Sequence, residues 1–327
     1  MKVENVVYMI NSGCNFRCKF CLNNWKYDNT PMSNLSFDEK IKILNKIKEL
    51  GSKNLTISGG EPLLDNRLSD LIRHASDLGL NVNLLTNGSL LTEEFLDKVK
   101  DKLESIQVSL EGIKEIHNTL TETQSYDKVV NNIKIVKSKG IKLMTNFTIT
   151  KLNYKNLEEY VLLLKELKIA VVNFTRIYPS GYGKKNWKEL MIEIKEYEEF
   201  VKKLNEIATE NKNIKFRLAG PTPMCLLEKN KIKLEFNTCG AGVDELAINP
   251  NGDILPCPSW PKGIGNLLKN NFEEILENKE MKKIVNRTEL NSTCKSCNHF
   301  SKCKGGCLLH VIENSDRKDV YMVKAIS

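Results

Sequence analysis

The sequence predicts an α/β fold with a parallel sheet, followed by a smaller cysteine-rich domain. Strand-like and helix-like segments alternate from the N-terminus through residue 176, and six such βα units in a row imply parallel strands. Seven of the ten cysteines lie in residues 225–307, where this alternation stops. The length of 327 residues allows one large domain, or one large domain with a smaller one.

The expected strands are short apolar runs, and the segments between them carry apolar residues at helical spacing. We expect strands at Val3–Ile10, Asn54–Ser58, Asn81–Thr86, Ser105–Leu110, Lys142–Thr150 and Ala170–Arg176. We expect helices at Phe37–Leu50, Thr92–Leu103, Tyr126–Lys139 and Asn156–Leu167. Capping signals agree, because Ser36 and Thr92 precede helices and Gly51, Gly79 and Gly140 follow them.

The later part of the chain is organised differently. Tyr178–Lys185 contains a proline and two glycines and reads as a break, before a long helix over Trp187–Asn211 and a strand over Ile214–Ala219. We therefore expect a core domain over 1–185, a bridging helix and strand over 186–224 and a cysteine-rich domain over 225–327. That last domain shows little apolar periodicity, so it needs metal to fold.

Composition limits the class of protein. The formal charge of +8 comes mostly from scattered lysines, and no arginine-rich patch with interleaved aromatics suggests nucleic-acid binding. No apolar run approaches the 18 or so residues of a membrane span. Met1 leads directly into a strand-like segment, so we expect no signal peptide. The clustered cysteines then indicate metal in a reducing, oxygen-protected cytoplasm.

The first cysteine motif is Cys14-x3-Cys18-x2-Cys21. A cubane cluster has four irons, so three thiolates leave one iron open to a small molecule, as a catalytic metal site requires. Gly59-Gly60-Glu61-Pro62 directly follows a predicted strand. Its glycines allow close approach to a ligand, and its carboxylate suits a cationic amine. The alternative is a structural zinc knuckle.

Together these motifs resemble the radical S-adenosylmethionine (SAM) family. The resemblance implies a partial (β/α)6 barrel of TIM type, a [4Fe–4S] cluster on Cys14, Cys18 and Cys21, and SAM bound to its open iron. It implies that Gly59, Gly60, Glu61 and Pro62 hold the SAM amino group and that Phe20 lies near the adenine. Reductive cleavage of SAM would then yield a 5'-deoxyadenosyl radical, which takes a hydrogen atom from the substrate.

The family also places ligand contacts at the later strand ends. The residues matching those places are Ser109 and Glu111, which could instead be polar loop residues. Asn87 could line the same mouth or form a turn, and Asn146 and Thr148 on the fifth strand could face the barrel interior. Arg176 could meet an anionic group of SAM or substrate, or form a surface salt bridge.

The histidines and tryptophans give weaker signals. His117 could touch substrate, but a lone histidine is more often structural. We expect His74 and His299 to be solvated and Trp25 and Trp260 to be packing residues.

The second cysteine motif is Cys294-x2-Cys297-x5-Cys303-x3-Cys307. Four such cysteines would also satisfy structural zinc. Asn251-Gly252 signals a hairpin turn that brings Cys257 back toward Cys239.

With these cysteines the segment resembles the SPASM domain, which holds one or two auxiliary [4Fe–4S] clusters. By resemblance, Cys225, Cys239, Cys257 and Cys307 hold the first cluster and Cys294, Cys297 and Cys303 the second. The cysteine expected after Cys307 is missing. The second cluster would then have an open iron, be absent, or use His310, Asp316 or Asp319.

The predicted function is that of a radical SAM oxidoreductase, with auxiliary clusters that can accept the electron of a substrate radical. The favoured substrate is a peptide or protein, crosslinked or converted to formylglycine. The runner-up is a small metabolite, in a tetrapyrrole decarboxylase or sugar dehydrogenase. A third reading is a non-catalytic module that binds zinc or clusters. Expected partners are a flavodoxin or ferredoxin and, because the chain begins at the barrel, a separate leader-peptide-binding protein.

Overall fold

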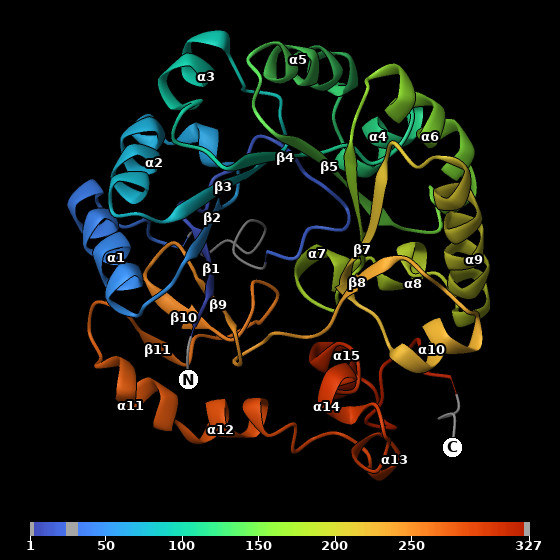
Figure 1. The fold of residues 1–327 in the computed structure, drawn as a ribbon. Coiled ribbons are helices and arrows are strands. Elements are labelled where there is room, and N and C mark those ends of the chain that lie inside the picture. The colour runs from blue at the N-terminus through green and yellow to red at the C-terminus, as the bar shows by residue number, and fades with distance from the viewer. Residues whose placement is uncertain (1–2, 24–31, 324–327) are drawn as a thin grey trace.

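A computed structural model describes residues 3–23 and 32–323 of the chain. Within them an 11-stranded sheet runs in the order β11-β10-β9-β1-β2-β3-β4-β5-β6-β7-β8. The neighbours from β9 to β8 are parallel, and β10 and β11 are antiparallel. The sheet does not return to its first strand, so it is a curved, partial barrel (Figure 1).

The predicted strands are confirmed, with small changes at their ends. The strands are β1 Asn5–Met9, β2 Asn54–Ser58, β3 Asn81–Thr86, β4 Ser105–Ser109, β5 Leu143–Ile149, β6 Val171–Arg176, β7 Lys215–Pro221, β8 Glu235–Asn237, β9 Glu245–Ile248, β10 Asp253–Leu255 and β11 Gly265–Asn266. The hairpin predicted around Asn251-Gly252 joins β9 to β10.

Helices cover the outer face of the sheet as an arc (Figure 1). They are α1 Phe37–Glu49, α2 Leu68–Asp77, α3 Glu93–Val99, α4 Lys114–Thr121, α5 Tyr126–Ser138, α6 Leu157–Glu166 and α9 Ile194–Glu210, with 3₁₀ turns at Pro62–Leu64 and Tyr154–Asn156. The four helices predicted by range correspond to α1, α3, α5 and α6. Ser36 and Glu39 form the capping box that begins α1, and Thr92 caps α3.

The long helix predicted over Trp187–Asn211 is wrong. The chain forms α8 Trp187–Leu190 and then α9, because Met191 is extended at ψ 127°. The Glu193 backbone N–H donates to the Glu196 carboxylate at 2.7 Å, which begins a new helix there. The break predicted at Tyr178–Lys185 contains a short helix, α7 Gly181–Lys185.

The two faces of each central strand have different environments. In β4, Ile106 and Val108 are fully buried in the core under the helices, whereas Gln107 and Ser109 line a cavity on the inner face. This alternation follows from the two-residue period of a strand. The apolar core therefore lies outside the barrel wall, and the polar residues that point inward are free to form a site.

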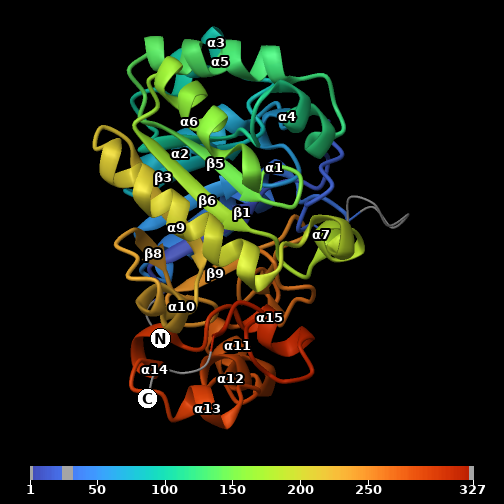
Figure 2. The ribbon, with the colours of Figure 1, turned by 90° about the vertical axis from the view of Figure 1, so that its right-hand side faces the viewer.

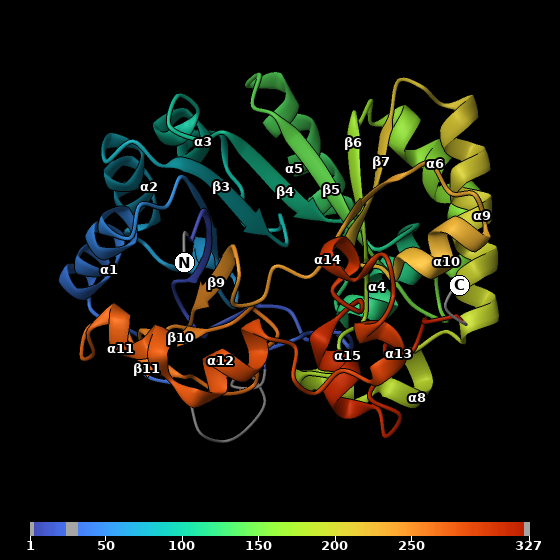
Figure 3. The ribbon, with the colours of Figure 1, turned by 60° about the horizontal axis from the view of Figure 1, so that its bottom comes forward.

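The C-terminal elements form a layer beneath the barrel (Figures 2 and 3). They are α10 Met224–Lys229, α11 Phe272–Glu277, α12 Lys279–Val285, α13 Ser292–Lys295, α14 Phe300–Cys303 and α15 Leu308–Glu313. The sheet continues across the boundary expected at residue 225, because β9 pairs with β1 in parallel register. None of the described helices is long and apolar enough to span a bilayer.

Candidate functional site

The first three cysteines lie on the loop that follows β1. Cys14, Cys18 and Cys21 all line one cavity of about 310 Å³ at the carboxyl ends of the parallel strands. The loop is fixed to the end of α4, where the Lys19 N–H donates to the Leu120 carbonyl at 2.9 Å. The three thiols therefore share one space, as the sequence predicts.

The turn after β2 packs directly against this loop. The Gly60 N–H donates to Asn11 at 2.8 Å and the Glu61 N–H to Gly13 at 2.7 Å, both to backbone carbonyls. A Cβ on Gly60 would lie 2.0 Å from the Gly13 carbonyl oxygen, and one on Gly59 would lie 2.3 Å from the Asn11 side chain. The glycines are thus required for contact between turn and loop, a reason that differs from the close ligand approach expected from the sequence.

Glu61 is buried and firmly positioned. Its carboxylate accepts hydrogen bonds from the Thr86 hydroxyl at 2.6 Å, the Asn87 N–H at 2.8 Å and the Leu63 N–H at 3.1 Å. Glu61 and Asn87 both line the cavity, whereas Pro62 begins a 3₁₀ turn beside it and does not. The end of β3 therefore orients the carboxylate of the turn after β2.

A second contact with the cysteine loop comes from α7, which the sequence reasoning treated only as a break. The Gly183 N–H donates to the Cys21 carbonyl at 3.1 Å, and the Ser180 hydroxyl donates to the Leu22 carbonyl at 3.0 Å. Gly181 has φ +53°, and a Cβ there would lie 2.6 Å from the Cys21 carbonyl. The signal that could have revealed this contact is the Pro-x-Gly-x-Gly spacing, which suits a tight approach of two backbones.

Polar residues on and after β4, β5 and β6 line the same cavity as the three cysteines. They are Ser109, Glu111, Asn146, Thr148 and Arg176. The Glu111 carboxylate accepts from the Thr148 N–H at 2.6 Å through one oxygen. Within the part of the chain that the structure describes, its other oxygen has no hydrogen-bond partner, and neither has the Asn146 side-chain oxygen. Burial raises the pKa of Glu111 to about 8, since charge is costly there.

His117 supports the site from behind and does not line the cavity. It is fully buried on α4, and its Nδ1 accepts the Glu111 N–H at 3.3 Å. Burial lowers its pKa to about 4, so the ring is neutral and can accept. His117 is therefore a positioning residue for the end of β4, which agrees with the structural alternative and not with a contact with substrate.

The remaining histidines and tryptophans have structural surroundings. His74 contacts the Asn45 side chain at 2.8 Å, and His299 lies 3.0 Å from the Glu228 carboxylate. Trp260 is buried in an apolar cluster of the C-terminal domain, which confirms the prediction that it is a packing residue. Trp25 lies outside the described residues.

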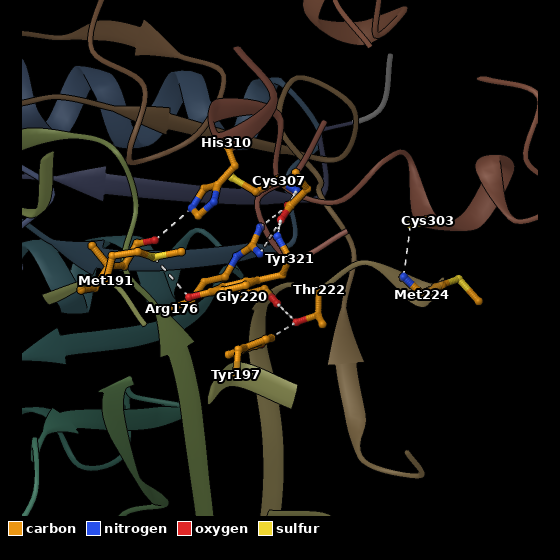
Figure 4. A network of polar contacts seen from close by, with 12 residues as sticks. Arg176, Met191, Tyr197, Gly220, Thr222, Met224, Cys303, Cys307, His310 and Tyr321 are labelled. Atoms are coloured by element: carbon orange, nitrogen blue, oxygen red, sulfur yellow. Dashed lines mark hydrogen bonds and ion pairs between the residues drawn. The ribbon is translucent and has the colours of Figure 1, made fainter. Parts of the chain in front are cut away.

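Arg176, at the end of β6, meets a carboxylate of its own chain. Its guanidinium binds Asp319 through two hydrogen bonds, one of them 2.9 Å long, and both residues are almost completely buried (Figure 4). Burial alone would raise the pKa of Asp319, but Arg176 holds it below its usual range. The guanidinium expected to meet an anionic group of SAM or substrate is therefore already paired.

The C-terminal cysteines form two sets, and their membership differs from the expectation. Cys225, Cys294, Cys297 and Cys303 line one small apolar pocket. The Met224 N–H, next to Cys225, donates to the Cys303 sulfur at 3.4 Å (Figure 4). Cys225 thus lies in the same pocket as Cys303, whereas the resemblance implied that it would lie with Cys257.

The other set is Cys239, Cys257 and Cys307. These three pack into the same apolar cluster as Met9 and Ala247, under the barrel. Burial raises the pKa of the Cys257 thiol, and the nearby Cys239 and Cys307 raise it further. The Cys307 N–H donates to the Asp319 carboxylate at 2.7 Å, so the Arg176 pair also fixes this cysteine.

The residues expected to replace the missing cysteine have other partners. His310 contacts the Ile177 carbonyl at 3.0 Å through Nε2, and Asp319 is bound by Arg176. Asp316 is exposed and pairs with Lys318 at 2.9 Å. Neither His310 nor Asp316 lines the pocket of Cys225, so neither reaches the set they were expected to complete.

The donor sets suit iron–sulfur clusters and SAM. All ten cysteines are thiols and not disulfides, and they fall into sets of three, four and three. Thiolates are the ligands that such clusters require. The partnerless oxygens of Glu111 and Asn146 lie in the cavity with the first set, where hydroxyl or amino groups of a ligand can satisfy them. Among the described residues, no three potential ligands converge closely enough to hold a single metal ion.

Comparison with known proteins gives two family matches. The model of the radical SAM superfamily matches residues 8–167, which contain the end of β1, the first cysteine motif and the elements from α1 to α6. The model of the SPASM iron–sulfur cluster-binding domain matches residues 239–298.

Curated relatives are similar over most of the chain. The AdoMet-dependent heme synthase of Methanosarcina barkeri is 25% identical over 92% of this chain and 90% of its own length. The PqqA peptide cyclase of Bradyrhizobium diazoefficiens is 26% identical over 92% of this chain and 80% of its own length. The mycofactocin maturase MftC of Mycolicibacterium smegmatis is 26% identical over 90% of this chain and 75% of its own length.

Solved structures share the fold. Streptococcus suis SuiB superposes with a TM-score of 0.78 at 19% identity, over 98% of this chain and 77% of the other. The structure of anSMEcpe with bound AdoMet superposes with a TM-score of 0.77 at 19% identity, over 97% of this chain and 93% of the other. These similarities extend through both the barrel and the cysteine-rich layer.

Proposed function

The chain belongs to the radical SAM enzymes that carry a SPASM domain, and we propose that it oxidises a peptide or protein substrate. Its cofactors are SAM and [4Fe–4S] clusters. Cys14, Cys18 and Cys21 would hold the cluster that binds SAM. When bound and reduced, this cluster supplies the electron that cleaves SAM to methionine and a 5'-deoxyadenosyl radical.

The observation that carries the proposal is the continuity of one cavity. It is lined by the first three cysteines and by Glu61, and also by Tyr178 and Pro258. Pro258 follows Cys257, and Tyr178 packs against the cluster that contains Cys239 and Cys307. A substrate in this cavity therefore lies between the SAM site and an auxiliary site, so its electron has a short path to an acceptor.

The chain's own residues bind and orient the ligands. Glu61 is positioned by three hydrogen bonds and lines the cavity with the first cysteines, so we assign it as the acceptor for the SAM amino group. Phe20 and Asn87 line the same cavity. Ser109 pairs with Asn146 across β4 and β5, and Glu111 follows β4. We assign these three residues to the ribose and to the polar end of SAM.

A large substrate is supported by the partial barrel and by a relative. The sheet does not close on itself, since β8 and β11 are its two edges. The PqqA peptide cyclase is similar over 92% of this chain, including both domains. A reducing protein and a separate protein that presents the substrate would complete such a system.

A small metabolite is the second candidate. It is supported by the heme synthase, which this chain covers over 90% of that relative's length. A non-catalytic cluster-binding module, by contrast, would not require a carboxylate as firmly oriented as that of Glu61 beside an open-iron site.

The test is SAM cleavage by anaerobically reconstituted, dithionite-reduced protein. We expect 5'-deoxyadenosine from the wild type and none from Cys18→Ala. Production should increase with short peptides encoded beside the gene, which should lose hydrogen by mass spectrometry. Stimulation only by a tetrapyrrole carboxylate would replace the peptide proposal with the second candidate, and absence of 5'-deoxyadenosine under all conditions would overturn both.

A further inference from the structure

The set of three cysteines under the barrel has a carboxylate on its edge. In the β9–β10 hairpin, Ala247 pairs with Leu255 in antiparallel register. β10 ends at Leu255, and the same register continued by two residues brings Cys257 to the level of Glu245. Residues two apart on a strand point to the same face, so the side chains of Glu245 and Ala247 leave β9 together. The Glu245 carboxylate and the Cys257 thiol therefore leave the hairpin on the side where Ala247 and Leu255 pack with Cys239 and Cys307.

Backbone contacts hold this edge together. The Gly242 N–H donates to both the Glu245 carbonyl at 3.1 Å and the Pro256 carbonyl at 3.0 Å, which ties the two strand ends to the turn after Cys239. A Cβ on Gly240 would lie 3.2 Å from the Glu245 Cβ. Glu245 thus lies between the segments that carry Cys239 and Cys257.

The Glu245 carboxylate lacks a partner of its own. Among residues 3–23 and 32–323, none donates a hydrogen bond to it or forms an ion pair with it. The Glu245 residue is partly buried and lines a cavity with Gly240, next to Cys239 in the chain. A partly buried carboxylate without a protein partner can bind a cation, and a cluster iron would supply one.

The other set is already complete without Glu245. Cys225 lies in the first turn of α10 and lines the same pocket as Cys294, Cys297 and Cys303. The hydrogen bond from the Met224 N–H to the Cys303 sulfur holds this turn against the pocket. Four thiols are what a closed [4Fe–4S] cluster requires.

We propose that Cys225, Cys294, Cys297 and Cys303 ligate one auxiliary cluster, and that Cys239, Cys257, Cys307 and the Glu245 carboxylate ligate the other. The proposal rests on the assignment of the chain to the SPASM enzymes. Cys225 takes the role of the cysteine missing after Cys307. The carboxylate-bound iron is the one held least tightly, because iron–sulfur clusters prefer thiolate to oxygen ligands.

The first experiment tests Glu245 by iron content and spectroscopy. It uses the Cys14/Cys18/Cys21→Ala variant, reconstituted without oxygen, so that both auxiliary clusters contribute about eight irons and the front site none. Brief mild oxidation should convert one cluster to the three-iron form, seen by electron paramagnetic resonance. Glu245→Gln should make this conversion at least several-fold faster, and Glu245→Cys should suppress it.

The neighbouring Asp244→Asn serves as the matched control, because Asp244 is exposed and carries the same charge. Asp244→Asn should convert to the three-iron form at the same rate as the Cys14/Cys18/Cys21→Ala variant without a further change. If Glu245→Gln and Asp244→Asn both leave the rate of conversion and the Mössbauer spectrum unchanged, Glu245 is not a ligand.

The second experiment tests the place of Cys225 with two double variants in the same background. Cys225→Ala/Cys303→Ala should remove two ligands from one cluster and leave the spectrum of the other intact, with about four irons. Cys225→Ala/Cys257→Ala should perturb both spectra. The reverse pattern would overturn the proposed division of cysteines. Neither experiment uses SAM or substrate, so its failure leaves the proposed function standing, and the failure of SAM cleavage leaves the ligand assignment standing.

Discussion

Arg176 and Asp319 form a buried ion pair between residues 143 positions apart in the chain. The pair joins the end of β6 to the segment after α15, and its carboxylate also accepts the Cys307 and Tyr321 N–H groups. The Arg176 guanidinium lies 5.2 Å from the centre of the Tyr321 ring, which stacks on Tyr197 at 4.0 Å. One polar contact thus joins the barrel wall to the backbone of Cys307.

Removal of one member of this pair should destabilise the protein strongly. Asp319→Asn or Arg176→Met leaves a buried charge without its partner, which costs about 3–5 kcal/mol. Urea unfolding under anaerobic conditions should show this loss. The exposed pair of Lys282 and Glu277 is the control, and Lys282→Ala should change little. Equal effects of the two changes would contradict the role assigned to burial.

Gly60→Ala should prevent assembly of the first cluster site. The new Cβ would lie 2.0 Å from the Gly13 carbonyl oxygen, so the turn after β2 must separate from the cysteine loop. We expect about four fewer irons per chain after reconstitution. Gly13→Ala is the matched control in the same loop, since its Cβ would meet only Leu64 at 3.8 Å. It should retain the iron, and a loss equal to that of Gly60→Ala would refute the steric argument.

Glu61→Gln should weaken SAM binding without removing the cluster. The amide keeps the shape of the side chain but loses the charge that attracts an amino group, a difference of about 1.5–3 kcal/mol, or roughly 10- to 150-fold in affinity. Equilibrium dialysis with SAM measures it, and iron content controls for the cluster. Unchanged affinity would show that the SAM amino group lies elsewhere.

His117 should make stability depend on pH. Burial lowers its pKa from 6.5 to about 4, so the unfolded chain binds a proton that the folded chain rejects between these values. The stabilisation is fully present above pH 6.5 and is lost as the pH falls toward 4, by about 3 kcal/mol. His117→Gln, which keeps an acceptor for the Glu111 N–H, should flatten this dependence relative to the wild type in urea unfolding.

The barrel could be predicted well because its signals are local. Apolar runs, capping residues and glycines lie within each βα unit, and β1 to β7 follow them. The break between α8 and α9 could not be predicted, because methionine and glutamate, the residues at 191 and 193, are both common within helices. The pairing of β9 with β1 was also invisible, since no short-range pattern specifies which distant strand completes a sheet.

In the candidate site, too, the residues with local signals could be predicted and those placed by distant contacts could not. Motif residues such as Cys14 and Glu61, and strand residues such as Ser109 and Asn146, were expected together and line one cavity. The partner of Arg176 and the neighbours of Cys225 were not foreseen, because they depend on how the C-terminal layer folds back. Glu245 could not be predicted as a site residue for another reason. Its position at the level of Cys257 depends on the register of the β9–β10 hairpin, which the sequence does not specify.

The pairing of β9 with β1 has a consequence for biosynthesis. Asn5 contacts Asp244 across 239 residues, so one edge of β1 stays exposed until most of the chain has left the ribosome. Contacts this distant slow folding, and an unpaired strand edge is prone to aggregation. We therefore expect chains that end before β9 to aggregate more readily than the full chain, because the edge of β1 that pairs with Glu245–Ile248 has no partner in them.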